Sequence, residues 1–196
     1  MWKFKTPGIP DEEFKRAEKV PITKEEVRVI QISKARLKPG QIVYDIGCGS
    51  GSVSIEAALQ IESLGKVFAI DYDKNAIELT KKNIEKFDVP NISVIYGNAK
   101  EKILDPEEAD AIFIGGTGRD TKEIVELSEN KLKVGGRIVI GTILIETFYS
   151  VLQVLDKLQF ESIDITQVTI SKSRKTSTGT MMLARNPVTI ISATKI

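Results

Sequence analysis

Short apolar runs and longer amphipathic segments follow one another along the chain. Such runs are typical of buried strands, whereas an apolar residue at every third or fourth position is typical of a helix. The apolar runs predict strands at residues 41–46, 66–70, 92–96, 109–114, 137–141, 161–170 and 188–194. The amphipathic segments predict a first helix from Thr23 to a point before Pro39, and further helices at residues 51–63, 74–87, 121–132 and 146–158. Thr23 and Glu26 have the spacing of a capping box for the first helix.

The order of these elements predicts the class of fold. Strands that alternate with helices form parallel sheets covered by helices on both faces. The last two strands have no helix between them, so we expect them to pair antiparallel at one edge. We therefore predict an α/β fold with a doubly wound, mostly parallel, Rossmann-like seven-stranded sheet and a C-terminal antiparallel hairpin. Residues 1–196 are expected to form one domain, in which residues 1–22 are an extended arm with a short helix at 11–19.

A glycine-rich turn connects the first strand to the helix after it. Its sequence is Asp45-Ile46-Gly47-Cys48-Gly49-Ser50-Gly51. The N-terminus of a helix offers free backbone amides to a ligand, and small residues let that ligand approach the backbone. Asp71 ends the second strand 20 residues after Gly51, at a spacing where an acid can bind a ribose diol. The dinucleotide fingerprint needs glycine at position 52, which is Ser52, and this argues against NAD.

The pattern G-x-G-x-G, with an acid two positions before it, resembles motif I of the class I S-adenosylmethionine (SAM)-dependent methyltransferases. The resemblance extends from residue 41 to the C-terminus. It implies that SAM is the cofactor, that residues 47–51 bind its methionine end, and that Asp71 binds its ribose. It also implies that Gly97-Asn98-Ala99 lies along the adenine. Asn98 replaces the aspartate of many members, which leaves the backbone of Ala99 as the expected contact.

Segments outside the glycine turn are similar to one subfamily. They are PGIPDEEF at 7–14, PITKEEVR at 21–28, GGTG at 115–118, GTMM at 179–182 and RNPV at 185–188. Together they resemble the cobalt-precorrin-6B methyltransferases (decarboxylating) of the anaerobic cobalamin pathway. This family methylates ring carbon 15 of a corrinoid precursor and removes carbon dioxide from the ring C acetate. The resemblance implies a standalone enzyme that assembles as a homotetramer, with Thr23 at the SAM pocket.

A tetrapyrrole acceptor carries many carboxylates, which Arg and Lys side chains can bind. Lys172, Arg174, Lys175 and Arg185 are the candidates, and charges that only keep a loop soluble are the alternative. Gly116 and Thr117 follow the fourth strand, where glycines would admit a flat ring; a flexible turn is the alternative. Three further residues have weaker claims. Met181 and Met182 are expected to pack in the core, and an apolar surface against the ring is the alternative. Glu146 is an active-site carboxylate or a helix N-terminal acid.

Composition limits the chemistry that the chain can perform. The sequence has no His and a single Cys, Cys48, which excludes His-based catalysis, internal disulfides and iron–sulfur clusters. Cys48 is expected to fill a tight turn in the cofactor loop, no metal site is expected, and no residue is identified as the catalytic acid or base. The net charge is +1, and no apolar run is long enough to span a membrane. We therefore expect a cytoplasmic protein without nucleic-acid or membrane partners.

Two other classes of protein remain open on the sequence alone. A SAM-dependent methyltransferase that acts on tRNA, of the adenine-N1 type, or on protein would share the same core. Against tRNA, the sequence contains no Asn-Pro-Pro-aromatic motif, and its net charge is only +1. The second alternative is a non-catalytic or NAD-binding Rossmann protein.

Overall fold

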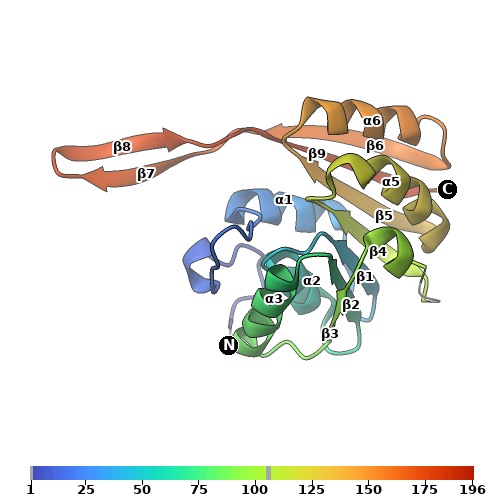
Figure 1. Ribbon diagram of the computed structural model, residues 1–196, viewed down its shortest axis with the longest axis horizontal. Helices are drawn as coiled ribbons and strands as arrows, with labels where there is room; N and C mark the ends of the chain where they lie inside the picture. Colours follow the sequence, from blue (N-terminus) through green and yellow to red (C-terminus); the bar gives the residue numbers. More distant parts are fainter. Residues whose placement is uncertain (1, 105–106) are drawn as a thin grey trace.

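The protein, described by a computed structural model over residues 2–104 and 107–196, is a sheet between two layers of helices (Figure 1). The strands of the sheet are β1 (Ile42–Ile46), β2 (Lys66–Asp71), β3 (Ile92–Tyr96), β4 (Ala109–Ile114), β5 (Leu132–Thr142), β6 (Phe160–Val168) and β9 (Val188–Lys195). Their order is β3-β2-β1-β4-β5-β9-β6, and only β9 runs antiparallel to its neighbours. The prediction of a mostly parallel, seven-stranded sheet with an antiparallel C-terminal pair is confirmed.

Helices cover both faces of this sheet. They are α1 (Glu25–Ala35), α2 (Ser52–Ile61), α3 (Lys74–Phe87), α4 (Ala99–Lys102), α5 (Thr121–Lys131) and α6 (Ile145–Leu155), with the short 3-10 helices η1 (Asp11–Glu13) and η2 (Gly118–Asp120). Side chains alternate across each strand, so Val43 of β1 packs toward α1, α2 and α3 and the next residue, Tyr44, packs toward α5 and α6. The chain crosses from β3 to β4, on the other side of β1. This reversal opens a crevice at the carboxyl ends of β1 and β4.

The N-terminal arm packs against the body of the protein through buried groups. Its Ile9 is fully buried, and the helix expected at 11–19 is reduced to η1. Glu56 of α2 accepts hydrogen bonds from the backbone amides of Gly8 and Ile9 and pairs with Arg28 of α1. Arg28 also donates to the backbone carbonyls of Ile9 and Thr23. Since Arg28 and Glu56 are both buried, they form an ion pair between α1 and α2 that salt screens little, and the arm is hydrogen-bonded to both of its partners.

The predicted capping box at α1 is wrong. Lys24 occupies the N-cap position, the helix begins at Glu25, and no side chain of its own caps it. The carboxylate of Asp11 accepts the amide of Glu25 instead, at 3.0 Å. The cap therefore comes from the arm, 14 residues earlier in the chain, and Thr23 is free to take another role.

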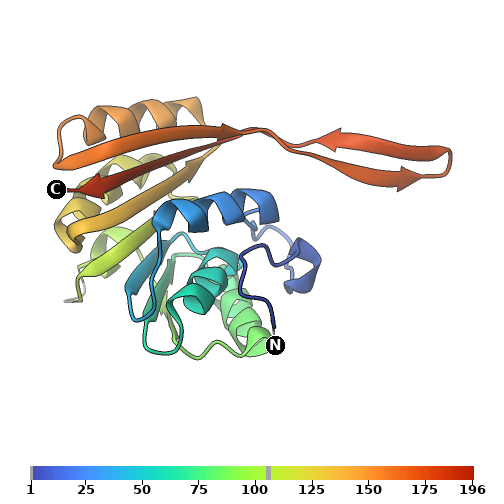
Figure 2. The ribbon, with the colours of Figure 1, turned by 180° about the vertical axis from the view of Figure 1, so that it is seen from behind.

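The connection between β6 and β9 forms a second, separate hairpin. Its strands are β7 (Ser171–Thr176) and β8 (Gly179–Ala184), and they extend away from the body of the protein (Figures 1 and 2). The sequence pattern predicts no strands in this segment, only a connection between residues 170 and 188. The expectation that Met181 and Met182 pack in the core is also wrong, because the hairpin lies beyond the sheet and leaves them 46% and 63% exposed.

Candidate active site

The glycine turn brings the ends of β1 and β4 into close contact. Gly47 has a φ of +75°, and a Cβ on it would lie 1.8 Å from the carbonyl oxygen of Gly115. The amide of Gly115 in turn donates to the carbonyl of Ile46, at 2.9 Å. Only glycine fits at position 47, because both the backbone conformation and the available space exclude a side chain.

Helix α3 holds the other side of this turn. Thr80 donates a hydrogen bond to the carbonyl of Gly49, and Asn83 donates to the carbonyl of Ser50, both at 2.9 Å. The sulfur of Cys48 lies 3.6 Å from the Thr80 hydroxyl. Burial raises the pKa of the Cys48 thiol well above its ordinary value, so the group stays protonated. Cys48 therefore acts as a small packing residue beneath the turn.

Two carboxylates, Asp45 and Asp71, lie behind the turn with different hydrogen-bond partners. Asp45 is buried and accepts a hydrogen bond from Ser54. Burial raises its pKa to about 6, against the effect of the Ser54 hydrogen bond and with the charge of Asp71 adding to the rise. Asp71 accepts the amides of Gly49 and Asp73, each at 2.9 Å. The Asp71 carboxylate therefore supports the turn from the end of β2.

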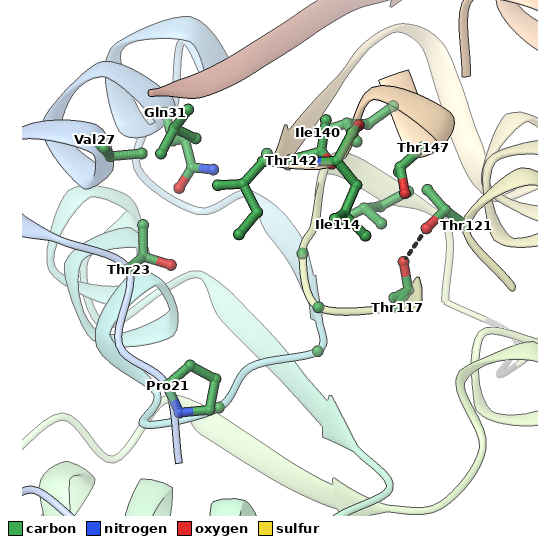
Figure 3. A pocket seen from close by; sticks show the side chains of 18 of the residues that line it. Pro21, Thr23, Val27, Gln31, Ile114, Thr117, Thr121, Ile140, Thr142 and Thr147 are labelled. Atoms are coloured by element: carbon green, nitrogen blue, oxygen red, sulfur yellow. Dashed lines mark hydrogen bonds between the residues drawn. The ribbon is translucent and has the colours of Figure 1, made fainter. Parts of the chain in front are cut away.

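A cavity of about 800 Å³ opens beside the turn, at the carboxyl ends of β1, β4 and β5 (Figure 3). This volume lies within the range of sites for small molecules and cofactors. The bare backbone of Gly47 and Gly49 forms part of the lining, and residues 114–118 and 140–144 continue it at the ends of β4 and β5. The segment before α1 and α1 itself add Pro21, Ile22, Thr23, Lys24, Val27 and Gln31, and the remaining lining residues are Thr121, Thr147, Arg185, Asn186 and Val188.

The cavity gathers part of the predicted site. Six predicted residues line it: Thr23, Gly47, Gly49, Gly116, Thr117 and Arg185. Seven lie outside the lining: Cys48, Ser50, Gly51, Asp71, Ala99, Arg174 and Lys175. The three loop residues among these contact α3, and Ala99 begins α4. Arg174 and Lys175 are exposed on β7 of the projecting hairpin, and Glu146 is exposed on α6.

The charged groups that line the cavity are paired with acids. Lys24 lies 3.6 Å from a carboxylate oxygen of Asp11, and Arg185 lies 3.5 Å from Glu26 and 3.9 Å from Asp11. Lys172, just outside, lies 2.6 Å from Glu26. Partial burial opposes ionisation of Glu26, but the hydrogen bond from Lys172 and the nearby cations hold its pKa below the ordinary value. The base of the hairpin, at Lys172 and Arg185, is thus bound to Glu26 in the first turn of α1.

Several polar lining residues were not predicted, among them Gln31, Thr121, Thr142 and Thr147. Gln31 lies four residues after Val27 and four before Ala35, on the buried face of α1. A polar residue within an apolar stripe is the sequence signal that marks Gln31. Thr142 is the last residue of β5, so its place at the carboxyl end of a strand was a second such signal.

Residues 2–104 and 107–196 contain no group of three or more His, Cys, Asp or Glu side chains placed to hold a metal ion. No helix in this part of the chain combines the length and the apolar character needed to cross a membrane.

Comparison with known proteins identifies the family. The precorrin methyltransferase domain family matches residues 13–195, nearly the whole chain. The chain belongs to this family. Over 193 residues it is 51% identical to a protein of Sulfurisphaera tokodaii named "probable cobalt-precorrin-6B C(15)-methyltransferase (decarboxylating)", with 98% of this chain and 100% of that protein covered.

Two solved structures of the family have the same fold. The precorrin 8W decarboxylase of Methanobacterium thermoautotrophicum superposes with a TM-score of 0.88 at 34% identity, over 94% of this chain and 98% of that one. The precorrin-6y C5,15-methyltransferase of Geobacter metallireducens superposes with a TM-score of 0.89 at 33% identity, over 97% and 99%. The coverage is nearly complete in both, so the likeness is to the whole fold and not to a part of it.

Proposed function

We propose that the protein is a SAM-dependent C-methyltransferase that acts on cobalt-precorrin-6B in cobalamin biosynthesis. It methylates ring carbon 15 and removes the ring C acetate carboxylate as carbon dioxide. The observation that carries this proposal is the cavity between the glycine turn and the end of β4, in a chain whose near full-length relatives are named for this reaction. The whole of residues 1–196 serves as the methyltransferase domain, with the arm at 1–22 as part of the cavity wall.

The residues of the turn fit SAM. Gly47 and Gly49 present bare backbone to the cavity at positive φ, where a side chain would block a ligand. We assign the methionine end of SAM to residues 47–51 and Thr23, the ribose to Asp71, and the adenine to the backbone of Ala99. Bound there, SAM supplies an electrophilic methyl group. The protein contributes alignment and exclusion of water, which are the main needs of a displacement at a methyl carbon.

The acceptor occupies the side of the cavity formed by β4, β5 and α1. Gly116 and Thr117 leave room for a flat macrocycle, and Arg174, Lys175 and Arg185 are the candidates for its outer carboxylates. In the decarboxylation, the bond between the carboxylate carbon and its methylene breaks and the electron pair passes into the conjugated ring. Carbon dioxide leaves, and a proton from solvent is added to the methylene carbon. The macrocycle itself is the electron sink for this step.

We further propose a cytoplasmic homotetramer. The hairpin supports assembly, because an isolated two-stranded hairpin is marginally stable in water and this one exposes the apolar side chains of Met181, Met182 and Leu183. Sedimentation equilibrium measures the assembly directly; a species of about four times the 21.7 kDa chain mass supports it and a monomer contradicts it. A reducing compartment suits the single, buried thiol.

Calorimetry with SAM and S-adenosylhomocysteine tests the proposed function first. We expect binding by the wild type and at least roughly tenfold weaker binding by Asp71→Ala, because that variant loses two hydrogen-bond acceptors at the turn. Unchanged affinity in Asp71→Ala removes this residue from the site, and no binding by the wild type contradicts the function. Methyl incorporation and carbon dioxide release from cobalt-precorrin-6B then test the acceptor. Methylation of tRNA in place of this substrate would favour the alternative acceptor.

A further inference from the structure

Gln31 lines the cavity and has a buried amide oxygen without a hydrogen-bond partner in the described residues. Its side chain descends from α1 with the amide group toward the open space (Figure 3). The residue is 6% exposed, and its Oε1 is enclosed and has no hydrogen-bond partner in the described part of the chain. Buried polar atoms are nearly always paired, because an unpaired one loses its bonds to water without replacement. An orphaned oxygen on a cavity wall therefore indicates a ligand that completes it.

The residue facing Gln31 is a glycine, Gly141. A Cβ on Gly141 of β5 would lie 2.3 Å from the Nε2 atom of Gln31. Gly141 does not have the positive φ that requires glycine, and it pairs with Ile190 in the interior of the sheet. Glycine weakens a strand interior, and its presence there often marks a close approach. Thus two residues that are individually unfavourable for stability meet at one point of the cavity wall.

The surroundings of Gln31 set the chemistry of its ligand. Val27 and Ile140 of the lining are apolar, and the two cations of the lining, Lys24 and Arg185, are ion-paired with acids. A primary amide has two donors on nitrogen and an acceptor on oxygen. A carboxyl group is its complement, since the carboxyl carbonyl accepts from Nε2 and the protonated hydroxyl donates to Oε1. Low solvent exposure favours the protonated form of a carboxyl group that binds there.

We infer that Gln31 binds a side-chain carboxyl of the acceptor, the acetate that is lost, and that Gly141 provides the space for this amide. The inference rests on the proposed function and adds a residue for the decarboxylation half of the reaction. A neutral amide can orient this carboxyl without the charge stabilisation that a cation would give to the bound carboxylate. The carboxyl gives up its proton to solvent before its bond to the methylene breaks, so this proton and the one added to the methylene carbon balance. The carboxyl group that leaves is thereby bound by a different kind of residue from the outer carboxylates, for which Arg and Lys side chains are the candidates.

The test compares Gln31→Met, which keeps the length of the side chain and removes its polar atoms, with Gln153→Met on the exposed face of α6. For Gln31→Met we expect SAM affinity within about twofold of wild type and an unchanged or higher Tm. Affinity for cobalt-precorrin-6B, titrated by absorbance without SAM, should fall roughly 10- to 100-fold. Carbon dioxide released per methyl transferred should also fall. Gln153→Met should match wild type in all four measurements.

Gly141→Ala provides an independent test, because the added methyl group displaces the Gln31 amide without changing Gln31 itself. It should reproduce the loss of acceptor affinity and of carbon dioxide release. Acceptor affinity and product ratio equal to wild type in Gln31→Met overturn the inference, as does a loss confined to SAM affinity, which would assign the amide to the cofactor. A lower Tm with a normal product ratio also overturns it and leaves Gln31 a packing residue. Failure of wild type to bind SAM overturns the proposed function instead.

Discussion

The N-terminal arm and the β7–β8 hairpin are both bound to α1, but by contacts of different kinds. The arm is joined through Arg28 and Glu56, whose side chains are 0% and 1% exposed. The hairpin is joined through Lys172 and Arg185, whose side chains are 41% and 31% exposed. Buried ion pairs are strongly destabilising when one partner is removed, whereas exposed pairs contribute little. The cavity wall formed by the arm is therefore part of the core, and the hairpin is an appendage.

The largest effect is expected from Gly47→Ala in the turn. The added methyl group meets the carbonyl oxygen of Gly115 at 1.8 Å, so β1 and β4 must separate. SAM affinity should fall by at least roughly 100-fold in calorimetry. Gly40→Ala is the matched control, because Gly40 also has a positive φ, +83°, with no atom near its Cβ position. Equal behaviour of the two variants would show that backbone strain, and not the contact with Gly115, dominates.

The arm and the hairpin should differ in how much the free energy of unfolding falls when one partner of an ion pair is removed. Arg28→Met should lower the free energy of unfolding by about 3–5 kcal/mol, because it leaves Glu56 buried without its cation. Lys172→Met should lower it by about 1 kcal/mol or less. Urea denaturation of both variants measures the difference. Similar losses would contradict the division into core and appendage.

The pH dependence of stability identifies a further property of the buried region. The pKa of Asp45 is about 6 in the folded protein and 3.8 ordinarily, so between these values the folded protein binds the additional proton. Stability should fall as pH rises through this window, by up to about 3 kcal/mol. Asp45→Asn does not titrate and should be more stable than wild type at pH 7 by about this amount, with the difference vanishing near pH 3.8. Urea denaturation across this range tests it; a constant difference would contradict the raised pKa.

The smallest effect on stability is expected in the hairpin. Met182→Ser changes a side chain that is 63% exposed, so the free energy of unfolding should stay within about 0.5 kcal/mol of wild type at low protein concentration. If the exposed face of the hairpin joins subunits, the same variant should lower the assembly mass in sedimentation equilibrium. A large loss of monomer stability would show that the hairpin belongs to the core after all.

The parts of the fold that the sequence predicted correctly are those with strong local patterns. The helix at 74–87 and the strand at 92–96 have the predicted bounds, because their periodicity is uninterrupted. The hairpin was not predicted, because all residues from Ser171 to Thr176 are polar and the run resembles a loop. The cap of α1 was assigned to Thr23 because local spacing favours it, whereas Asp11 arrives from a distant segment.

The candidate site also contains residues that the sequence predicted and residues that it did not. The glycine turn was predictable because conformation and close approach restrict Gly47 and Gly49 to one residue type. Gln31 and Thr147 were not predicted, since each becomes part of the cavity only when separate elements pack together. The ion pairs of Arg185 were equally invisible, because Glu26 lies 159 positions away in the chain.

The position of β9 affects how the chain folds while it is being synthesised. Residues 188–195 are inserted between β5 and β6, although they follow both in the chain. Until a ribosome has released them, the facing edges of β5 and β6 expose unpaired backbone, and such edges are templates for association with other chains. The nascent protein thus passes through a stage with an open gap in its sheet. Closure of this gap by the last strand is the step at which chaperone dependence and misassembly should concentrate.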